Sequence, residues 1–289
     1  MRLRSDPIEE DVLEEYLGSA SDFEFELRIL RILTDLGIHC QHGGQYQDPE
    51  TKKFREFDIR FRHTLAPVTV VAALECKAVS KHFPLLVSTV PRSDHEAYIE
   101  AYVFRKRKSP AWGETFITNL NQNVTARRLK SAMIYPAGMP VGKSTAQVGR
   151  RDNSDGELLV NDKEFFEKWL QAVQSLDDLV EQIASQDYLE KRSSSDFNIA
   201  FPLPIVVVPN GCLWQADFQV DGRRTGKPYR TDRVPIYIGR IYNHNFPHSS
   251  LRVSHLEVMT EDGITSFVAS YLKDPDRLLS LVQGPKKET

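Results

Sequence analysis

The first periodic pattern of hydrophobic residues lies in residues 22–36. Apolar side chains recur there at spacings of three and four, and a glycine follows, so the segment is predicted to be an amphipathic helix. On this helix Glu24 shares a polar face with charged residues. Glu26 aligns instead with Ile29 and Leu33, and we expect it to point toward the core, where an acid needs a partner.

Strand-like patterns follow this helix. Residues 38–63 indicate two strands joined by a polar turn around Asp48 and Pro49. The run from Val68 to Leu74 is uncharged and rich in β-branched residues, which is typical of a strand that is buried on both faces. Residues 84–90 are predicted to form another strand, and residues 92–104 a short helix.

A second long helix is predicted to begin at Asn161, because Glu164 three residues later forms a capping-box pattern. Its apolar stripe needs a sheet as a partner. It comprises Phe165, Phe166, Trp169, Val173, Leu176, Val180 and Ile183. Residues 205–209, 212–220 and 234–242 then look like strands, with a turn near Asp221 and Gly222.

These elements predict a single α/β domain over residues 22–289 with a mixed central sheet. It would contain an insertion at about 80–160 and a β-rich extension at about 210–272, behind an acidic N-terminal arm at 1–21. The alternative is two domains that are divided near Ser193–Ser195, where a short serine-rich break occurs.

Charge is unevenly distributed along the chain. The net charge is −3, which by itself argues against nucleic-acid binding. Residues 1–26, however, hold nine acids and two bases, and the remaining residues have a net charge of +4. The acidic arm is either a solvated helix or a segment that covers a basic groove.

Composition indicates the cellular compartment in which the protein is expected. No run of 18 apolar residues occurs, and no apolar stretch follows the N-terminal basic residues, so we expect neither a membrane helix nor a secretory signal. The three cysteines, Cys40, Cys76 and Cys212, are far apart and suggest neither a zinc site nor a disulfide framework. A reducing cytoplasm fits this pattern.

The candidate chemistry lies where the buried strand ends. Side chains alternate along a strand, so Glu75 and Lys77 share a face, whereas Cys76 points into apolar packing. Asp58 lies on the preceding strand, and pairing of the two strands would bring it near Glu75. Two carboxylates with a lysine beside them suit a divalent cation that acts on a phosphodiester. The alternative is a structural salt bridge at an exposed strand end.

An acid two residues before a lysine is a weak signal, because roughly one or two such triplets arise by chance in a chain of this length. A second one, Glu50-Thr51-Lys52, lies in the polar turn. Context distinguishes Glu75-Cys76-Lys77, since a charged pair at the end of an apolar strand is costly unless it has a partner or a function.

Three segments together, FEFELRILRILTDLGIHC (23–40), FDIRF (57–61) and ALECK (73–77), resemble the PD-(D/E)xK phosphodiesterase superfamily. The resemblance covers residues 22–80, and the later helix and strand fit the family's α-β-β-β-α-β order. It implies a restriction endonuclease-like fold, Asp58 and Glu75 as ligands of Mg²⁺ or Mn²⁺, Lys77 as the catalytic lysine and Glu26 as a helix acid of the site. Phe57 replaces the motif's proline, and about 80 residues separate Lys77 from the second helix.

Basic segments are candidates for phosphate contacts. Lys143, Gln147 and Arg151 are spaced by four, with Arg150 adjacent, and would form a basic stripe if the segment were helical. In similar nucleases a lysine or glutamine on a following helix often lies near the metal. Further basic islands occur at residues 104–108, 127–130 and 223–233. The alternative is that each of these basic segments is only a solvated part of the surface.

The favoured hypothesis is a metal-dependent nuclease that acts on DNA in restriction, antiviral defence or repair; DNA is preferred over RNA by resemblance only. A homodimer or a partner protein is compatible with the pattern. Two alternatives remain: a module on the same fold that binds nucleic acid or a partner without cleaving, and an effector subunit that is silent until a partner docks.

Overall fold

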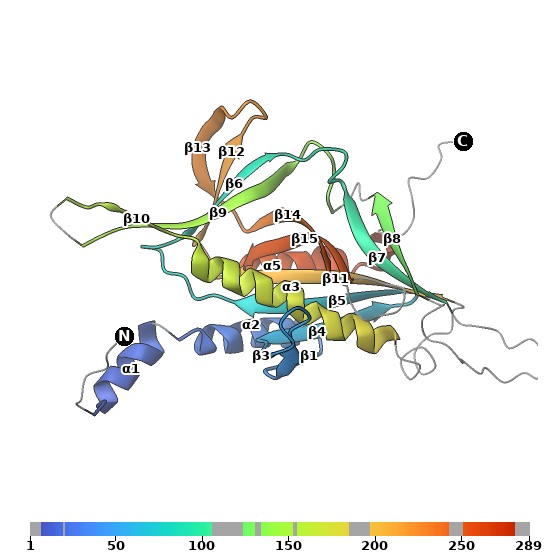
Figure 1. The fold of residues 1–289 in the computed structure, drawn as a ribbon, viewed down its shortest axis with the longest axis horizontal. Helices are drawn as coiled ribbons and strands as arrows, with labels where there is room; N and C mark the ends of the chain where they lie inside the picture. Colours follow the sequence, from blue (N-terminus) through green and yellow to red (C-terminus); the bar gives the residue numbers. More distant parts are fainter. Residues whose placement is uncertain are drawn as a thin grey trace, which may run out of the picture.

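The computed structural model describes residues 7–19, 21–105, 124–130, 134–152, 155–184, 197–242 and 251–280 (Figure 1). The helices are α1 (Glu10–Ser19), α2 (Phe23–Asp35), α3 (Lys163–Ala184), α5 (Glu261–Phe267), the π-helix η2 (Val268–Leu272) and α6 (Pro275–Ser280). The N-terminal strands are β1 (Cys40–His42), β2 (Gln45–Gln47), β3 (Phe54–Glu56), β4 (Ile59–Leu65), β5 (Val68–Cys76), β6 (Leu85–Pro91) and β7 (Tyr98–Arg105). The remaining strands are β8 (Val124–Lys130), β9 (Pro140–Arg150), β10 (Leu158–Asn161), β11 (Phe197–Val208), β12 (Leu213–Phe218), β13 (Arg224–Arg230), β14 (Arg233–Tyr242) and β15 (Leu251–Thr260).

One large mixed sheet organises the described residues. Its main path runs β1-β4-β5-β11-β15-β14-β9-β6-β12-β13, and β2 and β3 form a separate hairpin. β4 is antiparallel to β5, whereas β5, β11 and β15 run parallel. The expected mixed α/β class is therefore confirmed.

Strand β5 lies at the centre of the core, and all nine of its residues are buried, as its uncharged sequence predicts. Alternate residues from Val70 to Cys76 pack with α2 and α5, while Val71 and Ala73 pack against α3. In Figure 1, α3 crosses one face of this sheet. Glu75 is on the same strand face as Val71 and Ala73, so it points toward α3.

Several predicted elements are confirmed: helix 22–36 is α2, residues 84–90 form β6, and the helix near Asn161 is α3. Asn161 accepts a hydrogen bond from the Lys163 backbone N–H at 3.1 Å, as a capping residue should. The proposed Ser193–Ser195 boundary lies outside the described residues.

The helix predicted at residues 92–104 is wrong, and the condition under which residues 143–151 would form a basic stripe, that they be helical, is not met. Residues 92–104 lead into strand β7, which pairs with β8 and β11. Ile99 and Ala101 pack into one core cluster and Tyr102 into another, so the segment buries both faces at a period of two. Residues 143–151 belong almost entirely to β9, which pairs with β6, β10 and β14. In both segments, pairing within the sheet determines the backbone conformation, and spacings of three and four residues do not.

The segment expected as an insertion and the β-rich extension share one sheet. β6 and β9, from residues 80–160, pair with β12 and β14, from residues after 210. Sequence spacing therefore did not reveal that these segments are neighbours. Among the helices described, none is long and apolar enough to cross a membrane.

Candidate active site

Asp58 and Glu75 approach each other at the ends of two paired strands. Ile59 pairs with Leu74, so Asp58, one residue before β4, stands opposite Glu75 near the end of β5. The backbone N–H of Cys76 donates to Oδ2 of Asp58 at 2.7 Å, which fixes this carboxylate at the strand end. Glu75 is only 1% exposed.

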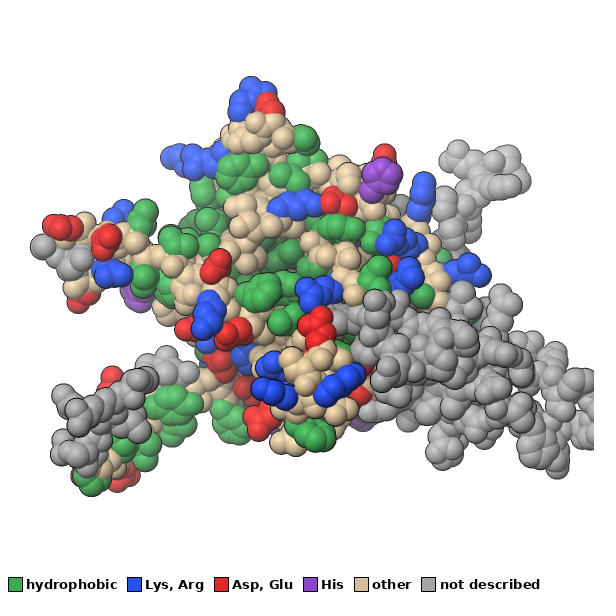
Figure 2. Space-filling view, in the orientation of Figure 1, with side chains coloured by type: hydrophobic (Ala, Val, Ile, Leu, Met, Phe, Trp, Pro, Cys, Tyr) green, Lys and Arg blue, Asp and Glu red, His purple; other side chains and the backbone are tan. Residues whose placement is uncertain are grey.

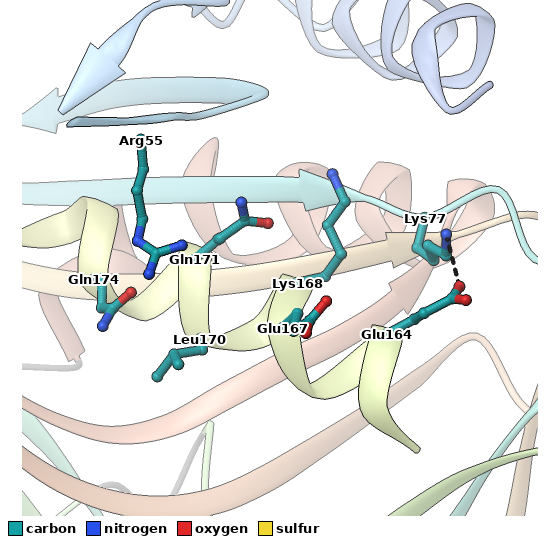
Figure 3. Close-up of a pocket in the computed structure, with 8 residues that line it drawn as sticks. All are labelled: Arg55, Lys77, Glu164, Glu167, Lys168, Leu170, Gln171 and Gln174. Carbon is teal, nitrogen blue, oxygen red and sulfur yellow. Dashed lines mark ion pairs between the residues drawn. The ribbon is translucent and has the colours of Figure 1, made fainter. Parts of the chain in front are cut away.

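Lys168 of α3 bridges the two carboxylates. Its Nζ lies 2.9 Å from Oδ2 of Asp58 and 3.4 Å from Oε2 of Glu75. Figure 3 shows Lys168 extending from α3 across the end of β5. One cation thus serves two acids, of which Glu75 is buried and Asp58 is partly exposed, and Oε1 of Glu75 is buried without a hydrogen-bond partner among the described residues.

The pKa shifts of the acids and of Lys168 follow from this shortage of positive charge. Burial and the neighbouring Asp58 carboxylate raise the pKa of Glu75 well above its usual value, although Lys168 opposes the shift. Burial lowers the pKa of Lys168, but the carboxylates of Asp58 and Glu75 outweigh it and the net shift is upward. Lys168 is therefore held as a cation.

Lys77, the lysine of the predicted motif, has other partners. Its Nζ lies 3.6 Å from Oδ2 of Asp22 and 3.3 Å from Oε2 of Glu164. The structure therefore brings Asp58 and Glu75 together, as expected, but it places Lys168 rather than Lys77 between them. The prediction that all three functional groups would meet directly is wrong in this respect.

Sequence reasoning missed Lys168, although a signal was present. Lys168 falls in phase with Phe165, Ala172 and Leu176, which are all fully buried on α3. A lysine on the apolar stripe of a helix needs an anionic partner, and the acids at the end of β5 are that partner. The helix that supplies a lysine to the site is thus α3, and not residues 143–151.

The helix acids take the orientations predicted from their phase. The Glu24 side chain is 76% exposed and pairs with Arg28, whereas that of Glu26 is 16% exposed. Oε2 of Glu26 lies 3.5 Å from Nε2 of His42, a residue that the sequence did not single out. Burial and then the charge of Asp58 raise the pKa of Glu26, which places Glu26 within electrostatic range of the carboxylate pair.

A pocket of about 340 Å³ lies beside this cluster (Figure 3). Its lining combines bases and amides with two glutamates of α3: Arg55, Lys77, Lys168, Gln171, Gln174, Glu164 and Glu167, with Leu170. Gln171 and Gln174 present hydrogen-bonding amides, and the three bases carry positive charge, although each of them also pairs with an acid. The walls can therefore contact an anionic group next to the carboxylates.

The donor set fits a magnesium-type cation. In the part of the chain that the structure describes, no three His, Cys, Asp or Glu side chains form a metal-binding group. Mg²⁺, however, is usually bound through one or two carboxylates, with waters and substrate oxygens completing the shell. Asp58 and Glu75 are such a pair, and the unpartnered Oε1 of Glu75 is a free acceptor.

The four residues predicted to contact nucleic acid lie on β9 or, in the case of Arg151, directly after it, and they already have partners. Lys143 pairs with Glu96, and Gln147 is buried, with its amide 3.4 Å from the carbonyl of Phe83. Arg150 donates to the carbonyl of Gly156 at 2.7 Å, and Arg151 lies 3.7 Å from Glu157. Because the segment is a strand, these residues do not form a helical stripe, and their contact with nucleic acid stays a prediction.

Comparisons with protein-family models, with curated proteins and with solved structures found no match for this chain.

Proposed function

We propose that this protein is a metal-dependent nuclease that hydrolyses phosphodiester bonds of nucleic acid. The observation that supports it best is the pair Asp58 and Glu75, which share one lysine while an oxygen of Glu75 is buried without a partner. Burying such an incomplete network costs stability, so an additional ligand is expected.

The order of elements supports a restriction endonuclease-like core. Helix α2 is followed by β1, β4 and β5, and α3 precedes β11. Neighbouring strands follow the order β1-β4-β5-β11, antiparallel except for the final parallel pair. With β2, β3 and β6–β10 left aside, these elements follow the α-β-β-β-α-β order that the sequence resemblance implies, and this agreement supports the proposal.

In the proposed site, Asp58 and Glu75 would hold the cation, which would offset negative charge on the phosphate and lower the pKa of a bound water molecule. Lys168 places a fixed positive charge within the same cluster, where negative charge develops on the phosphate. Lys77 lines the adjacent pocket and contributes to holding the substrate. Glu26, which pairs with His42, adds a further carboxylate on the α2 side of the site, within electrostatic range of Asp58.

The test is cleavage of plasmid, linear duplex, single-stranded DNA and RNA with Mg²⁺, Mn²⁺ or chelator. Asp58→Asn and Glu75→Gln should each lose at least about a hundredfold in rate, or roughly 3 kcal/mol of barrier stabilisation. Glu50→Gln is the matched control, because Glu50 begins the other acid-x-Lys triplet and is exposed. Metal-independent cleavage, or full activity of Glu75→Gln, would contradict the proposal.

A second candidate is a non-cleaving or partner-activated subunit on the same fold. It is supported by Lys168, which already neutralises part of the carboxylate charge as a structural ion pair would. Such a protein would bind nucleic acid but would not hydrolyse it, whichever divalent metal ion is added. Cleavage that appears only after addition of a partner protein would indicate the regulated form.

A further inference from the structure

The strands β12 and β13 form a two-stranded ribbon with an unusual charge pattern. Residues 213–230 contain four bases and two acids. Asp217 is engaged within the ribbon and its base: its Oδ1 accepts from Thr89 and Gln215, and its Oδ2 accepts from Tyr229. Asp221 pairs with Arg223 at the turn. The acids are therefore already engaged.

The remaining bases, Arg224, Lys227 and Arg230, are exposed. Among the described residues, none of these three forms an ion pair with an acid. Arg230 instead lies over the ring of Trp214, its cross-strand neighbour, at 5.2 Å. Figure 1 shows the ribbon projecting from the body, and Figure 2 shows Lys and Arg side chains over this projection. Three unpaired positive charges on a projecting element favour an anionic partner.

The base of the ribbon is connected to the candidate active site. β5 ends at Cys76, and the next strand, β6, begins at Leu85, which pairs with the first residue of β12. The connecting loop carries Lys77 and the exposed Lys81, which are at most about 14 Å apart along the chain. Lys81 packs beside Gly211, just before β12.

Lys81 and Arg230 both lie near Cys212. Burial and the charge of Glu261 raise the pKa of the Cys212 thiol, whereas Lys81 and Arg230 oppose that shift, so these charged groups are all within electrostatic range of the thiol. Positive groups thus follow one another from the pocket, through Lys77 and Lys81, to Arg230 on the ribbon. Such a path suits a polyanion whose backbone continues beyond the reacting phosphate.

We propose that the β12–β13 ribbon is a docking element for duplex DNA. The ribbon would lie in the major groove, and the phosphate backbone of the DNA would run past Lys81 to the carboxylates Asp58 and Glu75. This inference rests on the proposed nuclease function and names its substrate class. The major groove of B-form DNA, about 12 Å wide, admits a two-stranded ribbon. The major groove of duplex RNA is too deep and narrow for such readout, so the geometry favours DNA.

A different explanation exists for bases on β13, which ends the main path of the sheet. Lys and Arg on an edge strand also prevent unwanted pairing with other chains. That role requires no nucleic acid, so the two explanations predict different binding data.

The experiment measures binding of the full chain to labelled duplex DNA and duplex RNA by fluorescence anisotropy, with chelator and over a range of salt concentrations. The variant R224A/K227A/R230A should bind duplex DNA at least about tenfold more weakly. Its log–log salt slope should be shallower by about 0.9 for each phosphate that the variant no longer neutralises. The control R31A/K273A/R277A removes the same charge from α2 and the C-terminal helical region, and should bind like the wild type.

Equal binding by the ribbon variant and the wild type would overturn the inference and leave edge protection as the role of the bases. Duplex RNA bound as tightly as duplex DNA would also overturn it, as would absence of wild-type binding at low salt. Thermal unfolding checks that the variants fold. Binding is measured without metal, so it is tested separately from cleavage. If binding depends on the ribbon but no divalent metal ion supports cleavage, the proposed hydrolysis is refuted and this inference still holds.

Discussion

Two buried ion-pair clusters in this protein differ in how completely they are satisfied. Arg233 on β14 holds Glu257 on β15 through two parallel contacts, of 2.9 Å to Oε2 and 2.7 Å to Oε1. Lys168 on α3 instead divides one ammonium between Asp58 and Glu75 and leaves Oε1 of Glu75 without a partner. A bidentate arginine–carboxylate pair completes itself, whereas two acids with one lysine retain capacity for a cation.

Burial alone does not distinguish a structural ion pair from a site. Glu257 is 0% exposed and Glu75 is 1% exposed, so the two acids are equally inaccessible. They differ in the number of bases per acid and in the hydrogen-bonding atoms left over. We therefore propose that the first cluster stabilises the fold and that the second has a chemical role.

The largest expected effect is on the structural pair. Glu257→Gln removes the charge that compensates Arg233, and we expect it to lower the free energy of unfolding by about 4 kcal/mol. Chemical denaturation measures this directly. Glu50→Gln breaks the exposed pair with Arg240 and should change stability by less than about 1 kcal/mol. Equal effects of the two substitutions would remove the distinction between the pairs.

The next effect separates the two lysines. Lys168→Met should reduce the cleavage rate at least about a hundredfold, or roughly 3 kcal/mol, because Lys168 is the base that contacts the carboxylates. Lys77→Met should cost less in the maximal rate and more in substrate binding, since Lys77 lines the pocket. Steady-state kinetics distinguishes them, and the reverse ranking would restore Lys77 to the central role.

A third effect concerns His255, which lies near the structural pair. Its ring stacks on Tyr135 at 3.7 Å, and neither ring nitrogen has a hydrogen-bond partner among the described residues. Burial and the nearby charges of Arg92, Lys143 and Arg233 lower the pKa of His255 to about 2. Below the ordinary histidine pKa, the unfolded chain therefore binds a proton that the folded chain does not.

Stability should consequently fall as the pH drops below about 6.5, with this residue contributing up to about 1.4 kcal/mol per pH unit. His255→Phe leaves no polar nitrogen buried and should flatten this part of the profile. Chemical denaturation of the wild type and the His255→Phe variant tests this expectation. A range of roughly pH 4 to 8 covers the titration of an ordinary histidine. Parallel profiles would show that His255 does not contribute to acid sensitivity.

The smallest effect is on stability at the candidate site. Glu75→Gln removes a buried acid whose pKa is raised well above its usual value and leaves Lys168 paired with Asp58, so we expect a gain of about 1 kcal/mol at neutral pH. The same substitution should abolish cleavage. A loss of several kcal/mol, comparable to that of Glu257→Gln, would indicate that the Asp58, Glu75 and Lys168 cluster is structural.

The sequence predicted the local parts of this site well. Alternation along β5 placed Glu75 toward α3 and Cys76 into the core, and helical phase gave Glu26 its inward orientation. Both results depend on periodicity within one element, which a sequence contains directly. The position of Asp58 opposite Glu75 followed from strand pairing across one short turn.

Contacts between distant segments could not be predicted in this way. Lys168 lies 110 residues from Asp58 along the chain, and only the packing of α3 on the sheet brings the two together. β6, β7 and β9 likewise join the sheet through partners far along the sequence. Pairing of this kind depends on the whole fold, and it determines the backbone conformation at residues 92–104 and 143–151.

The most direct test of the central claim is the binding of Mn²⁺ to the full-length protein, followed by electron paramagnetic resonance of the free ion. We predict a saturable site that involves Asp58 and Glu75, weakened at least about tenfold by Glu75→Gln or Asp58→Asn, equivalent to roughly 1.4 kcal/mol, and unchanged by Glu50→Gln. Mn²⁺ binding that is absent from the wild type, or that is equal in the wild type and Glu75→Gln, would contradict the claim.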